Sequence, residues 1–93
     1  MTNSIFITGA TSGVGEACAR RFADAGWNLI ITGRREQRLK LIGEELATKT
    51  EVLTLAVDVR DRQAMQEAID NLPDRFARLT GLINNAGLAL GID

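Results

Sequence analysis

Three glycines punctuate the segment Thr8-Gly9-Ala10-Thr11-Ser12-Gly13-Val14-Gly15, which stands between the apolar run Ile5-Phe6-Ile7 and a helical stretch from Glu16 to Ala25. Glycine has no Cβ, so the backbone can turn sharply there and approach a ligand closely. The unpaired amides and the positive dipole of a helix N-terminus attract an anion. The segment therefore predicts a phosphate cradle, with a dinucleotide pyrophosphate as its occupant. Its G-x-x-x-G-x-G spacing differs from G-x-G-x-x-G, and the two patterns mark different branches of dinucleotide-binding proteins.

The coenzyme type is indicated by the residues that follow the second apolar run. Proteins that bind NAD carry an acidic residue about 20 residues past the glycine loop, where it binds the ribose hydroxyls. That position holds Gly33, and Arg34 and Arg35 follow it. Two guanidinium groups beside a missing carboxylate suit a 2′-phosphate, which favours NADP over NAD. The competing interpretation is that an arginine pair at the start of an exposed helix is simply solvated surface.

Polar side chains also follow the third and fourth predicted strands. Asp58 ends the third strand, where its carboxylate can accept a hydrogen bond from an adenine amino group. The alternative for Asp58 is a capping or turn role. Asn84 and Asn85 end the fourth strand, where their amides can tie the central strands together or line the cofactor trough. Position favours the trough for Asn85.

Four strands and three helices are expected to position these residues. Apolar runs rich in β-branched residues predict strands at 4–8, 28–32, 52–57 and 80–83. Apolar residues at helical spacing predict helices at 13–25, 35–48 and 61–72, the last capped by Asp61 and stopped by Pro73, with a turn from Asp74 to Arg78.

Strand and helix thus alternate as β-α-β-α-β-α-β, which predicts an α/β fold with a parallel sheet, right-handed crossovers and helices on both faces. This is the first half of a Rossmann-type sheet. The most economical strand order is 3-2-1-4, in which the first and fourth strands are neighbours at the topological switch point where ligands bind. The glycine-rich strand ends at 8–15 and 84–87 then lie side by side.

Size and charge limit the range of functions. The 93 residues can hold one core, and we expect them to be the N-terminal dinucleotide-binding half of a single domain at 1–93. A formal charge of −1 with 25% charged residues gives no basic field for nucleic acid. No apolar run approaches the roughly 20 residues that span a bilayer, and no signal peptide is evident, so a cytoplasmic location and no membrane partner are expected.

Few residues in the chain can do redox or acid-base chemistry. Cys18 is the single cysteine, and we interpret it as a small apolar residue on the buried face of a helix rather than as a redox group. The sequence has no tyrosine and no histidine, which excludes many acid-base mechanisms. No metal site is expected.

The chain resembles the short-chain dehydrogenases/reductases through Thr8–Gly15 together with Asn84-Asn85-Ala86-Gly87. The two motifs stand at strand ends, and the resemblance covers the whole chain. Within the family it looks like the NADP-dependent 3-hydroxy acid dehydrogenases of the serine 3-dehydrogenase or malonic semialdehyde reductase type. Four segments carry this finer resemblance: 33–35, 55–60, 71–73 and 85–91.

The resemblance implies a role for each matching residue. The glycine loop wraps the pyrophosphate, the arginines hold the 2′-phosphate, an acidic strand end flanks the adenine, and the asparagine motif lies by the ribose nearest the nicotinamide. The implied cofactor-binding residues are Gly9, Ala10, Thr11, Ser12, Gly13, Val14, Gly15, Arg34, Arg35, Asp58, Val59, Asn85, Ala86 and Gly87.

The resemblance also implies a catalytic serine and a tyrosine with a lysine four residues later, and none of these can be placed on the chain. We therefore expect the 93 residues to be the N-terminal part of a longer enzyme and to be inactive alone. The fourth strand would be a sheet edge that seeks a partner, so the isolated chain should oligomerise or aggregate. The complete protein is expected to be a homodimer or homotetramer.

The expected reaction is hydride transfer between NADP and a small hydroxyl or carbonyl substrate, possibly a 3-hydroxy acid such as serine. The coenzyme carries the chemistry, and the protein supplies placement and electrostatics. Two alternatives stay open. One is an NADP-binding sensor or structural module without turnover, and the other is a structural fragment that binds nothing.

Overall fold

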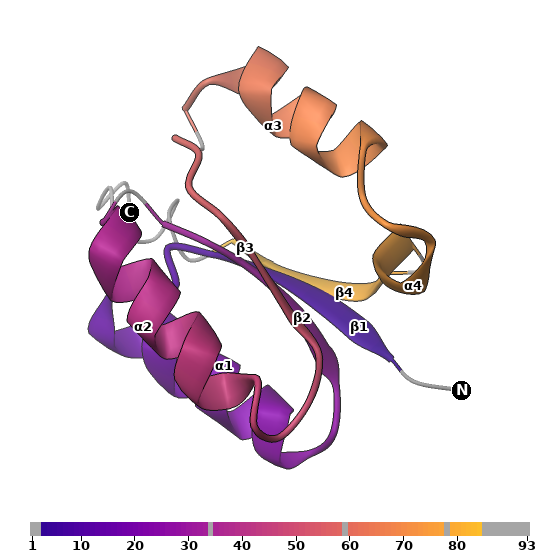
Figure 1. Cartoon of the computed structure of the whole chain (residues 1–93). Coiled ribbons are helices and arrows are strands. Elements are labelled where there is room, and N and C mark those ends of the chain that lie inside the picture. Colours follow the sequence, from indigo (N-terminus) through magenta and orange to yellow (C-terminus); the bar gives the residue numbers. More distant parts are fainter. Residues whose placement is uncertain (1–2, 34, 59, 78, 85–93) are drawn as a thin grey trace.

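The computed structural model describes residues 3–33, 35–58, 60–77 and 79–84, and strands and helices alternate along them except for two successive helices before the last strand (Figure 1). Their bounds in chain order are β1 (Ser4–Thr8), α1 (Gly13–Asp24), β2 (Asn28–Thr32), α2 (Glu36–Leu46), β3 (Val52–Leu55), α3 (Arg62–Asp70), α4 (Asp74–Ala77) and β4 (Leu79–Asn84). The α/β class expected from the sequence is confirmed.

The strands form one parallel sheet in the order β3-β2-β1-β4. Ile5 lies opposite Leu29 of β2, and Thr8 lies opposite Asn84 of β4. Because parallel strands end at the same edge of a sheet, the last residues of β1, β2 and β4 lie along one edge, where ligands bind in folds of this kind.

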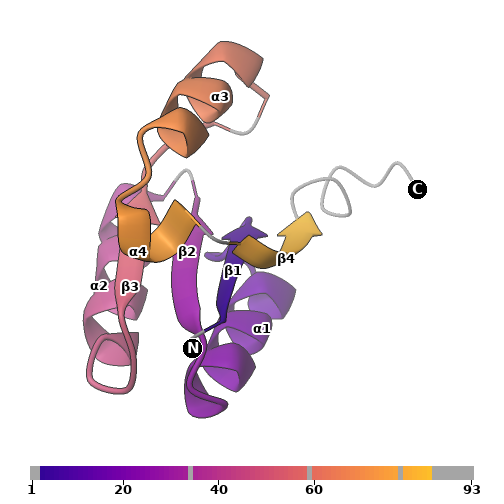
Figure 2. The same cartoon turned by 90° about the vertical axis from the view of Figure 1, so that its right-hand side faces the viewer.

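Helices cover both faces of the sheet (Figure 1). Ile5 and Ile7 of β1 pack with Leu29 and Ile31 of β2 beneath α1 and α2. Phe6 and Ile30 point to the other face, where Phe76 packs on them. The α4 helix lies against β2 on that face, with α1 and α2 behind the sheet (Figure 2). Covering on both faces explains why every residue of β1 and β2 is buried.

The third strand and the segment before the fourth differ from the expectation. β3 ends at Leu55 and not at Val57, because the Val57 amide donates to the Leu55 carbonyl (3.0 Å) and turns the chain out of the sheet. The expected turn from Asp74 to Arg78 is wrong, since it contains α4. The Phe76 amide there donates to the Pro73 carbonyl, and burial of the Phe76 ring fixes this turn of helix.

Other element ends differ by one or two residues, as helix and strand ends commonly do. The α1 helix ends at Asp24 instead of Ala25. The α2 helix (Glu36–Leu46) is shorter than the expected 35–48, and β4 (Leu79–Asn84) is longer than the expected 80–83. Cys18 is partly buried and packs on the core beneath α1, which confirms its structural interpretation.

The α3 helix is only partly covered. Its Met65 packs on the Phe6 side of the sheet, yet none of its residues is buried, and Ile69 is 40% exposed. None of the helices in the described part of the chain is long and apolar enough to span a membrane. Within those same ranges, no group of histidine, cysteine and acidic residues is placed to hold a metal ion.

Candidate cofactor-binding site

The glycine turn leaves the sheet at Gly9, whose φ of +66° lies in the left-handed region that favours glycine. The Gly9 carbonyl accepts from the Ser12 amide (3.1 Å) and from the Ser12 hydroxyl (2.9 Å), and these bonds close the turn. Ser12 is also the N-cap of α1, because its Oγ accepts from the Gly15 amide (3.1 Å). One serine therefore ties the end of β1 to the start of α1.

Gly15 is required by space. A Cβ at this buried position would lie 2.1 Å from the Gly9 carbonyl oxygen and 2.8 Å from its carbon. Both are backbone atoms, so no side-chain movement can relieve the contact. Gly13 differs, since a Cβ there meets no atom of the described residues within 4 Å. The next residue, Val14, is 63% exposed. The first turn of α1 therefore presents an open surface at the edge of the sheet.

The glycine turn lies directly beside the end of β2. The Ala10 amide donates to the Thr32 carbonyl (2.8 Å). A Cβ at Gly33 would lie 2.9 Å from Thr11 Cγ2 and 3.1 Å from Thr11 Oγ1. The structure thus brings together the two segments that the sequence assigns to the pyrophosphate and to the 2′-phosphate. The sequence analysis did not identify the contact between Thr11 and Gly33, because only the folded chain reveals it.

Of the two predicted 2′-phosphate ligands, the structure describes Arg35. Arg35 is exposed and is the N-cap residue of α2, with no side-chain capping bond. It comes two residues after Gly33 and so lies at the same edge as the glycine turn. Arg34 lies outside the described residues, and so do four other predicted site residues, Val59, Asn85, Ala86 and Gly87.

Asp58 has the turn role that was the alternative for it. Its Oδ1 accepts from the backbone amide (2.9 Å) and Nε (3.1 Å) of Arg60, and its Oδ2 accepts from Arg60 Nη2 (3.0 Å). Its carbonyl accepts from the Asp61 amide (2.9 Å). The hydrogen bond and charge of Asp58 raise the pKa of Arg60. Contact with an adenine stays a prediction for this residue.

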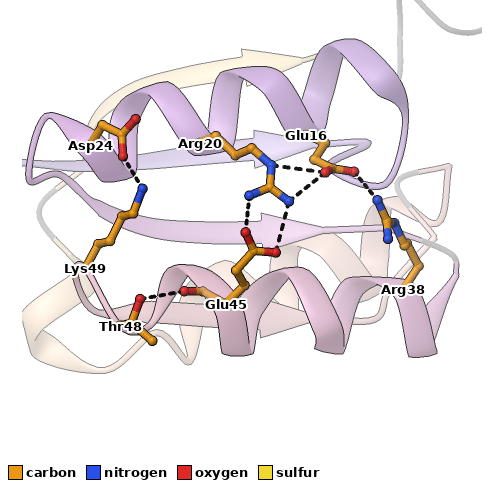
Figure 3. Close-up of polar contacts among 7 residues, drawn as sticks. All are labelled: Glu16, Arg20, Asp24, Arg38, Glu45, Thr48 and Lys49. Atoms are coloured by element: carbon orange, nitrogen blue, oxygen red, sulfur yellow. Dashed lines mark hydrogen bonds and ion pairs between the residues drawn. The ribbon is translucent and has the colours of Figure 1, made fainter.

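An ion-pair network that the sequence analysis missed joins the outer surfaces of α1 and α2 (Figure 3). Glu16, in the first turn of α1, accepts from Arg20 (2.8 Å) and from Arg38 (2.6 Å) in the first turns of α2. Arg20 also pairs with Glu45, and Lys49 pairs with Asp24. Only the Glu16 and Arg20 pair, four residues apart on one helix, carries a signal in the sequence.

The arginines shift the acid-base equilibria of both glutamates. Hydrogen bonds from Arg20 and then Arg38 lower the pKa of Glu16 below its ordinary 4.5. A hydrogen bond from Arg20 lowers the pKa of Glu45. The Glu16 pairs join the first turn of α1, after the glycine turn, to the first part of α2, after the arginine pair. The network therefore links the starts of the two helices that follow the loops of the site.

Glutamine in place of Glu16 is expected to lower the free energy of unfolding at neutral pH by about 0.5–1 kcal/mol, as for a favourable surface ion pair. Folding lowers the pKa of Glu16, so its ion pairs contribute fully above pH 4.5 and are lost as the pH falls through the lowered pKa. The deficit should therefore vanish in acid. Denaturant titrations of the complete protein check this, with exposed Glu44→Gln as the control. If Glu16→Gln lowers the free energy of unfolding equally at neutral pH and in acid, the ion pairs of Glu16 are not the cause.

Residues 3–92 match the family model of the short chain dehydrogenases, and the chain belongs to this family. It is 59% identical over 90 residues to sulfoacetaldehyde reductase 2 of Chromohalobacter salexigens, covering 97% of this chain and 36% of that protein. It is 48% identical over 91 residues to serine 3-dehydrogenase of Agrobacterium fabrum, covering 98% and 36%. The chain thus spans about a third of the length of these relatives.

Among solved structures, the chain is similar to the closed form of serine dehydrogenase complexed with NADP+. The TM-score is 0.74 at 38% sequence identity, and the match covers 85% of this chain and 31% of the other. The resemblance to the serine 3-dehydrogenase type is therefore confirmed. The sulfoacetaldehyde reductases are relatives that the sequence analysis did not name.

Proposed function

We propose that the complete protein is an NADP-dependent oxidoreductase that transfers a hydride between the nicotinamide and a small hydroxyl or carbonyl substrate. The observation that carries this proposal is the contact between the glycine turn and the end of β2. The Ala10 amide donates to the Thr32 carbonyl there, so the segments proposed to hold the pyrophosphate and the 2′-phosphate adjoin. Membership of the short-chain dehydrogenase family supports the reaction class.

The residues at this edge fit a dinucleotide. The twelve-residue helix α1 begins at the glycine turn, and the positive end of its dipole favours an anion. Gly13 and Val14 are exposed there, and a Cβ at Gly13 would meet open space. The backbone of residues 9–15 would hold the pyrophosphate, with Gly15 keeping α1 close to β1. When bound, NADP supplies the hydride chemistry, and these residues bind and orient it.

Arg34 and Arg35 are proposed to hold the 2′-phosphate. Gly33 presents no carboxylate that would repel that phosphate, and Arg35 is exposed beside it. Solved relatives complexed with NADP+ and NADPH support this choice of coenzyme. Asp58 and Val59 are proposed to flank the adenine, and Asn85, Ala86 and Gly87 the ribose nearest the nicotinamide.

The proposed substrate is a small acid with a hydroxyl or carbonyl group near its acidic group. Relatives named serine 3-dehydrogenase and sulfoacetaldehyde reductase support this class, since serine and sulfoacetaldehyde are both short and carry a carboxylate or a sulfonate group. We propose that residues 1–93 are the N-terminal dinucleotide-binding half of one Rossmann domain. The serine, tyrosine and lysine that the family uses in catalysis would then belong to a later part of the protein. The complete protein is proposed to act as a homo-oligomer.

Turnover tests the proposed reaction. The complete protein is mixed with NADPH and sulfoacetaldehyde, or with NADP+ and serine, and the absorbance of reduced nicotinamide is followed. We expect coenzyme-dependent turnover with at least one substrate of this class and slower turnover with NADH or NAD+. Coenzyme binding without turnover across a panel of short hydroxy and oxo acids contradicts the proposed substrate class and favours a binding module.

A further inference from the structure

Thr11 and Gly33 are packed against each other at the point where the glycine turn meets the end of β2. A Cβ at Gly33 would lie 2.9 Å from Thr11 Cγ2, closer than real Cβ contacts are. Among the described glycines, positive φ angles occur at Gly9 and Gly26 and not at Gly33. Position 33 therefore requires glycine because there is no room for a Cβ, and not because of its backbone conformation.

Thr11 has little freedom to move away. It is half-buried and β-branched, so few χ1 rotamers are open to it. Its neighbours on both sides are fixed by hydrogen bonds, Ala10 to the Thr32 carbonyl and Ser12 to the Gly9 carbonyl. A side chain at position 33 must therefore rotate Thr11 out of its place or push the whole glycine turn from β2.

We infer that Thr11 is a specificity-determining residue for the coenzyme, because it fills the space that a side chain at position 33 would need. The inference rests on the proposed NADP function. An acidic residue at this strand end is what binds the ribose hydroxyls of NAD. Thr11 excludes that residue sterically, so position 33 stays without the carboxylate that NAD binding needs, and this effect requires no contact between Thr11 and the 2′-phosphate. Conversion to NAD use then requires two changes, a smaller residue at 11 and a carboxylate at 33.

The test uses Gly33→Asp, Thr11→Ala and the double variant in the complete protein, with NADPH and NADH binding followed by nicotinamide fluorescence. Gly33→Asp alone should weaken NADPH at least about tenfold through charge repulsion and should gain little NADH affinity. The double variant should bind NADH at least about tenfold more tightly than Gly33→Asp does. Equal NADH affinity of the single and double variants overturns the inference.

Unfolding temperatures without coenzyme test the contact by itself. Gly33→Ala adds only the Cβ, and it should lower the unfolding temperature by about 2–4 °C. In the Thr11→Ala background the same Gly33→Ala change should leave the unfolding temperature unchanged, because the contact is gone. An equal effect of Gly33→Ala in both backgrounds overturns the steric contact. If the unmodified protein binds neither coenzyme, the proposed function fails instead, and the unfolding data still show whether Thr11 and Gly33 exclude a side chain.

Discussion

Replacing Arg34 and Arg35 together by aspartate is expected to weaken NADPH binding to the complete protein at least about a hundredfold. Hydrogen bonds between charged partners are worth about 1.5–3 kcal/mol each, and the two aspartates would also repel a 2′-phosphate. NADH lacks this phosphate, so its affinity should change less than about fivefold. Parallel calorimetric titrations with the two coenzymes measure both effects.

A matched control separates this local effect from the change in net charge. Lys40 on α2 and Arg62 on α3 are exposed, and changing both to aspartate alters the net charge of the protein by the same amount. This control should leave the ratio of the two affinities unchanged. An equal loss of NADPH and NADH affinity in the Arg34 and Arg35 variant refutes the assignment of the 2′-phosphate.

Alanine in place of Gly15 is expected to destabilise the protein by about 3 kcal/mol or more and to abolish NADPH binding. The new Cβ would lie 2.1 Å from the Gly9 carbonyl oxygen, so α1 must move away from β1. That movement pulls Ala19 and Ala23 of α1 from the core. It also opens the turn that Ser12 closes. Denaturant unfolding and coenzyme titration measure the two losses.

Gly13 provides the control within the same turn. A Cβ there meets no atom of the described residues within 4 Å, and its φ is not positive. Gly13→Ala should therefore keep the free energy of unfolding within about 0.5 kcal/mol of the unmodified protein. Equal destabilisation by the two substitutions would mean that the close approach of α1 to β1 is not what position 15 requires.

Much of the fold can be predicted from the sequence because local patterns and packing agree in β1 and β2. Their apolar runs predicted strands buried on both faces, and each is buried along its whole length. α4 could not be predicted, because four residues carry no helical periodicity and the burial of Phe76 depends on the sheet. The end of β3 was missed since a single hydrogen bond to Leu55 sets it.

The candidate site also combines features that local sequence predicts with contacts that only the folded chain reveals. The glycine turn before α1 was predicted from glycine spacing, and Ser12 as its cap adds the closing bonds. The turn role of Asp58 was one of two interpretations that its position allowed. The packing of Thr11 on Gly33 and the pairing of Arg38 with Glu16 join residues 22 positions apart. The first contact depends on how the glycine turn meets the end of β2, and the second depends on how α1 and α2 pack. No local pattern encodes either one.

Calorimetric titration of the complete protein with NADPH and with NADH tests the central claim most directly. The claim is that a coenzyme carrying a 2′-phosphate binds where the glycine turn after β1 meets the end of β2. We predict saturable NADPH binding at least about tenfold tighter than NADH binding, lost in the Gly15→Ala variant. No NADPH binding, or NADH binding that is equal or tighter, would contradict it.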